Sequence, residues 1–120
     1  MIANGEGALM AIDYLITQYG GKTANYLDLY GDTAIDDVSE GLSLLEYDPR
    51  VKVVCVNTFC GAFEVLQLVK ALLVQRRKGV QKKPVVMRIK GYHEKEAIQL
   101  LEEYQKAEMA ENGTQTIILC

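Results

Sequence analysis

The chain has 120 residues, of which 49% are hydrophobic and 24% charged, and its formal net charge is −3. This length fits one domain, and the apolar content is sufficient for a packed core rather than a disordered chain. The negative charge argues against nonspecific binding to nucleic acid, which requires a basic surface. No apolar run approaches the length of about 20 residues that spans a bilayer, and the apolar N-terminus lacks the basic segment of a secretory signal.

The cysteines indicate the redox state of the chain's surroundings. Cys55, Cys60 and Cys120 are scattered and odd in number, which predicts reduced thiols in an intracellular compartment. With a single histidine and no paired ligand spacing, no metal site is predicted.

The basic runs at 76–78 and 82–83 flank an expected turn. We expect them to be solvated cations near a helix end, where they complement the helix dipole.

Short apolar runs alternate along the chain with longer segments of helical period. Leu9, Ile12 and Ile16 share one helical face, for example, whereas VKVVCV is β-branched and almost wholly apolar. In chain order, the pattern predicts the end of a strand at 1–3, a helix over 8–19, a strand over 24–29, a helix over 36–47, a strand over 51–56, a helix over 62–78, a strand over 84–89, a helix over 93–110 and a strand over 116–119.

This alternation predicts an α/β fold in which right-handed crossovers join parallel strands. We expect one domain over residues 1–120, with an open parallel sheet of about five strands and helices on both faces. The chain ends on a predicted strand without a helix to cover it. We therefore expect either that both ends are trimmed or that a partner covers them.

Ligands of such sheets bind beyond the carboxyl ends of the strands. Four loops are predicted there, at 4–7, 30–33, 57–62 and 90–93, and each contains glycine. The glycines allow two interpretations: close approach of an anion to backbone N–H groups, or the ordinary need of a tight turn. The sequence holds no G-x-G-x-x-G, no G-x-x-x-x-G-K-[ST] and no G-x-S-x-G motif, so we predict neither a nucleotide site nor a hydrolase nucleophile.

The loops and their flanking strands together resemble one family. MIANGEGALMAIDYLITQYGGKTANYLDLYGDTA is similar to the start of the C-terminal ligase domain of the succinyl-CoA synthetase β subunit, which reads N-G-A-G-x-x-M-x-x-x-D and then G-G-x-x-A-N-F-L-D-x-G-G-G-A-T. YDPRVKVVCVNTFCGAF resembles S-D-x-K-V-K-x-x-x-V-N-I-F-G-G-I, and KPVVMRIKG resembles V-P-V-V-V-R-L-x-G. The resemblance covers nearly the whole chain, and ATP-citrate lyase has a related domain.

The resemblance implies a flavodoxin-like fold that pairs with an α subunit, which binds CoA and carries the phosphorylated histidine. It also implies that the glycine loop before the third helix presents that helix's N-terminus to phosphate, and that the same region holds succinate. ATP or GTP with Mg would bind a separate ATP-grasp domain, which is absent here. This chain is therefore expected to bind no cofactor of its own and to lack ligase activity alone. The compartment implied is the mitochondrial matrix in a eukaryote and otherwise the cytoplasm.

The resemblance assigns no catalytic residue to this chain, but it marks candidates for contact with an anion or substrate. They are Asn57, Phe59, Cys60, Gly61, Ala62, Asn4 and Gly31. The chain departs from the family in this same region. Cys60 replaces the first glycine of G-G-I, Glu64 stands where the family has arginine, and Tyr30 and Asp32 replace two glycines of G-G-G. We expect Glu64 in the first helical turn, where it would repel an incoming anion by a few kcal/mol at close range.

Five residues keep two interpretations each. His93, the only histidine, is either a residue at a helix start or a group at the ligand edge. Cys60 is either inert or a thiolate stabilised by a helix N-terminus. Arg88 matches a family arginine and is either an ion-pairing structural residue or an anion contact. Asn25 and Asp28 match family positions, and either packing or ligand contact explains them.

The sequence supports two functional hypotheses. The first is a β-subunit-like ligase domain that docks on a CoA-binding subunit and shares an active site with it. The second is a catalytically inactive structural subunit that uses the same fold inside a larger assembly. The chain is also compatible with a fragment of a longer enzyme.

Overall fold

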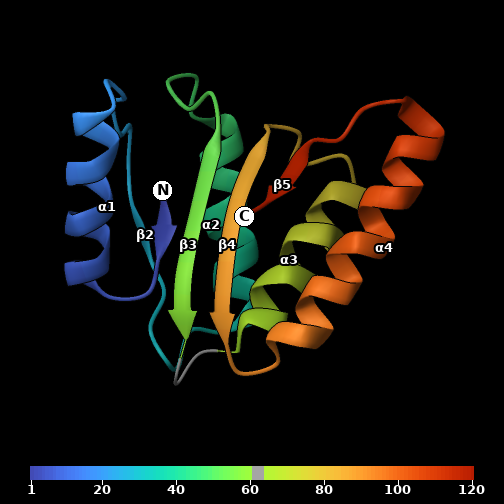
Figure 1. The fold of residues 1–120 in the computed structure, drawn as a ribbon, viewed down its shortest axis with the longest axis horizontal. Coiled ribbons are helices and arrows are strands. Elements are labelled where there is room, and N and C mark those ends of the chain that lie inside the picture. Colours follow the sequence, from blue (N-terminus) through green and yellow to red (C-terminus); the bar gives the residue numbers. More distant parts are fainter. Residues whose placement is uncertain (61–63) are drawn as a thin grey trace.

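The computed structural model describes residues 1–60 and 64–120, the side chain of Cys60 apart. Strands and helices alternate throughout this part of the chain (Figure 1). The elements are β1 (Ile2–Ala3), α1 (Glu6–Gln18), β2 (Leu27–Asp28), α2 (Ile35–Tyr47), β3 (Val54–Cys60), α3 (Val65–Arg77), β4 (Val85–Gly91), α4 (Glu94–Asn112) and β5 (Ile117–Leu119).

All five strands belong to one parallel sheet with the order β2-β1-β3-β4-β5. The predicted α/β fold with a flavodoxin-like sheet is thereby confirmed. β3 and β4 form its centre and pair over their full seven residues, from Val54 beside Val85 to Cys60 beside Gly91. The chain reverses direction across the sheet between β1 and β3, and this point is the topological switch at which such folds bind ligands.

The two faces of the sheet are covered unequally. Val85, Met87 and Ile89 of β4 are buried, and they belong to the main core together with residues of α2, α3 and α4. On the other face, α1 packs through Leu9 and Ile12 against residues of β1. Helices on both faces were predicted, and this is confirmed. Figure 1 also shows that α2 passes behind β3 and β4, whereas no helix of the described chain passes in front of them.

Several element boundaries differ from the sequence prediction. β2 was predicted over 24–29 but is limited to Leu27–Asp28, because Asn25 is drawn into other contacts. Its carbonyl accepts a hydrogen bond from the Met1 amine at 3.0 Å, and its side-chain amide donates to Asp48 at 3.0 Å. β3 begins three residues later than predicted and continues to Cys60. Asn57 to Cys60, predicted as loop, therefore belong to a strand.

The start of α3 also differs from the sequence prediction. The helix begins at Val65 rather than residue 62, and Glu64 is its N-cap with extended backbone angles of φ −78° and ψ 115°. Glu64 was predicted in the first helical turn, whereas it precedes that turn. Residues 62 and 63, predicted as the start of this helix, lie outside the described residues.

One member of the basic run at 76–78 is not solvated. Arg76 is only 9% exposed, and its guanidinium donates to the carbonyl oxygens of Lys82 and Lys83 and to the hydroxyl of Thr116. Burial lowers the pKa of Arg76. The prediction of solvated cations was wrong for Arg76, because α3 ends inside the junction that leads to β4 and β5 rather than at the surface.

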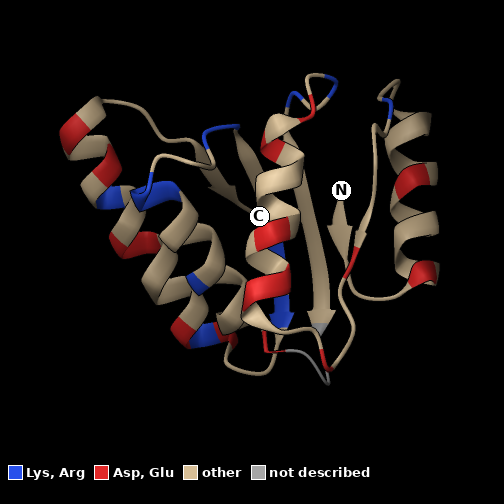
Figure 2. Cartoon of the chain, turned by 180° about the vertical axis from the view of Figure 1, so that it is seen from behind, with Lys and Arg blue, Asp and Glu red and all other residues tan. Residues whose placement is uncertain are grey.

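The helices differ strongly in charge. α2 carries four acidic residues among thirteen and α1 only two, Glu6 and Asp13. Viewed from the helix-covered side, Figure 2 shows acidic residues repeated along the outer surface of α2. α2 therefore presents a polar surface to water, as an outer helix normally does. In the described part of the chain, no helix is both long and apolar enough to cross a membrane.

Candidate site at the carboxyl edge of the sheet

Parallel strands bring the loops at 4–7, 30–33 and 90–93 to one edge of the sheet, together with the end of β3. The switch point between β1 and β3 is closed by Asn4. Its side-chain amide donates to the Phe59 carbonyl at 2.8 Å, and its Oδ1 accepts from the Phe59 N–H at 2.8 Å. Through its side chain, Asn4 thus adds one further pair of hydrogen bonds to the β1–β3 pairing. Because both polar groups of Asn4 are engaged, its contribution to a site is to position Phe59 and the end of β3.

Asp28 has a similar internal role at the end of β2. Its carboxylate accepts the N–H of Gly5, the N-cap of α1, at 2.6 Å. Gly5 has φ 97°, a backbone angle that favours glycine. This contact places a negative charge at the N-terminus of α1, where the helix dipole stabilises it. The α1 N-terminus is therefore partly neutralised from within the chain.

Gly31 lies in an exposed turn that connects β2 to α2. Tyr30 and Thr33 close the turn, with the Tyr30 N–H donating to the Thr33 hydroxyl at 2.8 Å and the Thr33 N–H donating to the Tyr30 carbonyl at 3.1 Å. The nearby Asp28 carboxylate raises the pKa of the exposed Tyr30 hydroxyl. Tyr30 thus stays neutral and adds an exposed aromatic ring to this edge.

Asn57 and Arg88 connect the ends of β3 and β4. The Arg88 guanidinium donates to Asn57 Oδ1 at 3.1 Å, and both side chains lie on the face away from α2. Arg88 forms no ion pair with a described residue. One residue further along β4, Lys90 donates to Glu94 at 2.5 Å and lowers the pKa of that carboxyl group.

The N-termini of α3 and α4 lie close together through Glu64 and His93. His93 is the N-cap of α4 in the left-handed conformation, with φ 62°. Its ring nitrogens lie 3.9 Å from the Glu64 carboxylate and 3.7 Å from that of Glu96, and its ring meets Tyr92 edge-on with centroids 4.3 Å apart. A shallow pocket of about 360 Å³ opens over residues 91–96. His93 is therefore surrounded by acids at this edge.

The predicted candidates are brought together only in part within the described chain. Asn4, Asn57 and Phe59 lie at the switch point, whereas Gly31 lies in the neighbouring turn. Cys60 is the last residue of β3 and pairs through its backbone with Gly91. Gly61 and Ala62 lie outside the described residues, so their predicted role stays a prediction.

The sequence prediction missed the Asn57–Arg88 pair and the Lys90–Glu94 pair. The four-residue spacing of Lys90 and Glu94 was a usable signal, but the first pair joins residues 31 positions apart and had none. Among the residues that the structure describes, no cluster of histidine, cysteine, aspartate or glutamate could hold a metal ion.

Comparison with known proteins agrees with this architecture. The CoA-ligase family model matches residues 2–118. The chain is 39% identical over 102 residues to the β subunit of a GDP-forming succinate–CoA ligase from Thermus thermophilus, covering 85% of this chain and 27% of that protein. It is 40% identical over 118 residues to the β subunit of an ADP-forming succinate–CoA ligase from Pyrobaculum arsenaticum, covering 92% of this chain and 30% of that protein.

Solved structures show the same fold at lower identity. ATP citrate lyase from Methanothrix soehngenii, in complex with citrate and coenzyme A, matches 99% of this chain and 31% of its own with a TM-score of 0.71 and 20% identity. The named relatives are bacterial and archaeal, which gives no support to a mitochondrial compartment. The chain spans less than a third of the relatives' length, and the match over residues 2–118 shows that it belongs to the CoA-ligase family, as a domain similar to that of succinate–CoA ligase β subunits.

Proposed function

We propose that this chain acts as the CoA-ligase domain of an acid–thiol ligase by docking on a CoA-binding, α-like subunit. Its carboxyl edge would offer the N-terminus of α3 to phosphate or succinate in a site shared across the interface. The observation that carries the proposal is the geometry of the switch point, where Asn4 fixes the end of β3 directly before α3. Family membership and the subunit names of the relatives support the docking part.

The chain's own residues would position and orient rather than react. Asn4 and Asn57 hold the ends of β1, β3 and β4 in register, and the start of α3 supplies backbone N–H groups that favour a negative charge. CoA would be held by the partner, and a nucleotide with Mg by a separate domain. With no phosphate-binding loop in its sequence, this chain leaves the nucleotide chemistry to those parts.

One observation favours the alternative, a catalytically inactive structural subunit. The Glu64 carboxylate lies at the N-cap of α3, 3.9 Å from His93. A fixed negative charge at this position competes with an incoming anion for the same favourable potential. On this alternative the domain keeps its docking surface and loses its share of the chemistry.

Purification of the chain with its bound proteins from its native host tests both candidates. We expect recovery of a CoA-binding subunit in a constant ratio, and succinate-dependent CoA ligation by the purified complex with ATP or GTP. A complex without ligation would favour the structural alternative. Recovery of no CoA-binding subunit would contradict the proposed docking.

A further inference from the structure

Glu64 occupies the N-cap position of α3, but its carboxylate does not cap the helix. A side-chain oxygen at this position normally accepts a hydrogen bond from the second or third N–H of the helix. Glu64 forms no side-chain bond of this kind. A carboxylate is attracted to a helix start, so its absence from these N–H groups indicates that other contacts hold it to one side.

Two side chains supply those contacts. The Gln67 amide donates to Glu64 Oε2 at 3.4 Å, and His93 Nε2 lies 3.9 Å from Glu64 Oε1. Gln67 belongs to the first turn of α3, whereas His93 caps the start of α4, which lies beside the start of α3 (Figure 1). One carboxylate oxygen thus contacts the side of α3, and the other faces the neighbouring helix start.

The backbone of His93 fixes its ring at this position. His93 has φ 62° and is the one residue other than glycine with a positive φ in the described part of the chain. Such a conformation is uncommon for a residue with a side chain. The ring packs edge-on against Tyr92 with centroids 4.3 Å apart, and 35% of the side chain is exposed. The imidazole is therefore fixed between the two helix starts and remains accessible to protons.

Carboxylates are the charged groups closest to the His93 ring. Glu64 faces it from α3, and Glu96 of α4 lies 3.7 Å from Nδ1. Lys90 of β4 and Glu94 of α4 form an ion pair with each other at 2.5 Å, so their charges largely offset. The other charged or titratable residues of the segment that carries the ring are Arg88, Tyr92 and Lys95.

The contact between His93 and Glu64 depends on the charge of the ring. A separation of 3.9 Å exceeds hydrogen-bond distance, so a neutral imidazole attracts the carboxylate only weakly. A histidine ring in general gains its positive charge as pH falls between about 8 and 5. An imidazolium at this position attracts the Glu64 carboxylate towards α4. Loss of the proton removes that attraction and leaves the carboxylate able to move to the N–H groups of α3.

We propose that His93 is a positioning residue: when protonated, it holds the Glu64 carboxylate away from the start of α3 and leaves those N–H groups open to an anion. When the ring is neutral, Glu64 caps its own helix and occupies the place of the anion. The use of this place by phosphate or succinate rests on the proposed function, whereas the movement of Glu64 does not.

Backbone NMR of the 120-residue chain tests the movement of Glu64 without a ligand. His93 is the only histidine, so its ring signals report one titration. We expect the amide shifts of residues 65–67 to change together with these ring signals between about pH 8.5 and 5.5. His93→Asn should abolish this change, because asparagine tolerates the left-handed backbone but carries no charge. An unaltered change in His93→Asn would overturn the proposal.

Variants of the two nearby acids identify the group that moves. Glu64→Gln should abolish the pH response of the α3 amides. Glu96→Gln is the matched control and should keep it, because Glu96 faces the other ring nitrogen and belongs to α4. Dispersed amide spectra check that each variant is folded. Loss of the response in both variants, or in neither, would overturn the role given to Glu64.

A titration with inorganic sulfate relates the movement to anion binding, because sulfate stays a dianion over this pH range. We expect sulfate to bind at residues 65–67 about threefold more tightly at the lower pH, the order of effect of an exposed ion pair. Glu64→Gln should remove most of this difference. A difference that persists in Glu64→Gln would show direct attraction by the imidazolium and would overturn the positioning role.

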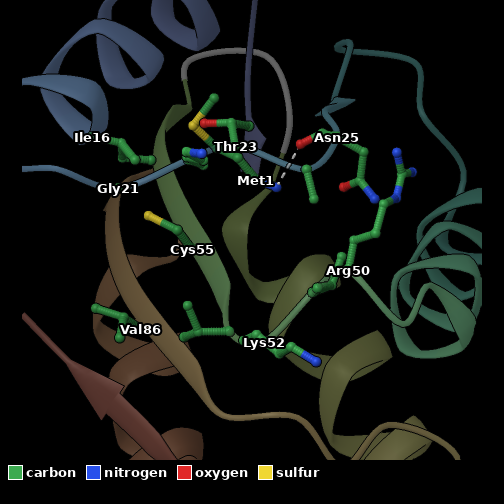
Figure 3. Close-up of a pocket in the computed structure, with 13 residues that line it drawn as sticks. Met1, Ile16, Gly21, Thr23, Asn25, Arg50, Lys52, Cys55 and Val86 are labelled. Atoms are coloured by element: carbon green, nitrogen blue, oxygen red, sulfur yellow. Dashed lines mark hydrogen bonds between the residues drawn. The ribbon is translucent and has the colours of Figure 1, made fainter.

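A second cationic region provides an internal control in the same titration. Lys22, Arg50 and Lys52 line a groove of about 410 Å³ near the amino end of β3 (Figure 3). Sulfate binding there should be the same in Glu64→Gln as in the unchanged chain. Absence of sulfate binding at residues 65–67 in every variant would contradict the anion site of the proposed function as well. Binding that does not depend on His93 would overturn this inference alone.

Discussion

Arg76 shows how one buried cation organises the junction between α3, β4 and β5. Its guanidinium contacts two successive carbonyl oxygens and Thr116, which is itself held by the Glu108 carboxylate. The guanidinium holds its N–H donors in one plane at fixed angles, which matches this set of acceptors. A lysine ammonium cannot reproduce these contacts. The residue therefore acts as a structural clamp for the amino ends of β4 and β5.

Replacement of Arg76 by lysine is expected to destabilise the domain by about 2–3 kcal/mol, because carbonyl groups in a partly buried junction lose charge-assisted hydrogen bonds. Urea unfolding measures the change. Arg77→Lys, at the exposed neighbouring position, is the control and should stay within about 0.5 kcal/mol of the unchanged protein. Equal effects at both positions would mean that the Arg76 contacts contribute nothing specific.

Cys55 is expected to react more slowly than Cys120 with an alkylating agent. Burial raises the pKa of the Cys55 thiol, whereas Cys120 is exposed. Because the thiolate is the reactive form, alkylation of Cys55 should increase only at higher pH. Since the folded state favours the neutral thiol, its contribution to stability is present below the ordinary thiol pKa and is lost as pH rises through the raised value. Mass-spectrometric peptide mapping across pH 7–10 separates the two sites, and coincident pH profiles would contradict this account.

At the scale of elements, the start of α3 departs from the family pattern, because Glu64 stands where that pattern has arginine. Glu64 caps the helix without a side-chain bond to its backbone, and it lies beside His93 of the next helix start. The interaction of its charge with the helix dipole stabilises the domain by about 0.3–1 kcal/mol. The same charge opposes any second anion at these N–H groups.

Glu64→Gln is therefore expected to strengthen the binding of inorganic phosphate at the start of α3 by severalfold, since a repulsion of about 1 kcal/mol is removed. Chemical shifts of the amides of residues 64–67, followed during a phosphate titration, measure the affinity. Glu96→Gln is the control, because Glu96 also lies near His93 but belongs to α4. An equal gain in both variants would show that general charge, and not the α3 terminus, governs binding.

The sequence allowed the type and order of the nine elements in the described residues to be predicted, because β-branched runs and helical periods are local signals. Boundaries were less accurate where tertiary contacts decide them. Hydrogen bonds of Asn25 with Met1 and Asp48 keep it out of β2. Pairing with β4 extends β3 over Asn57 to Cys60. At the candidate site, the loops and glycines were predictable, whereas the Asn4–Phe59 and Asn57–Arg88 contacts join distant residues and left no local trace.

At the scale of the whole molecule, the carboxyl edge is the surface that carries the candidate site. Tyr92 is exposed at this edge, whereas Leu44 is exposed on α2. Tyr92→Asp is therefore expected to abolish recovery of a CoA-binding subunit, and Leu44→Lys to leave that recovery within about twofold, since single exposed substitutions remain local. Equal losses in the two variants would contradict docking through the carboxyl edge.

We propose that the carboxyl edge meets a CoA-binding subunit. Hydrogen exchange of the chain, alone and in complex with that subunit, tests this contact most directly. We predict slower exchange at residues 4–7, 57–60, 64–67 and 90–93, with little change on the outer side of α4. Protection confined to α4 or to the amino edge of the sheet would contradict the account.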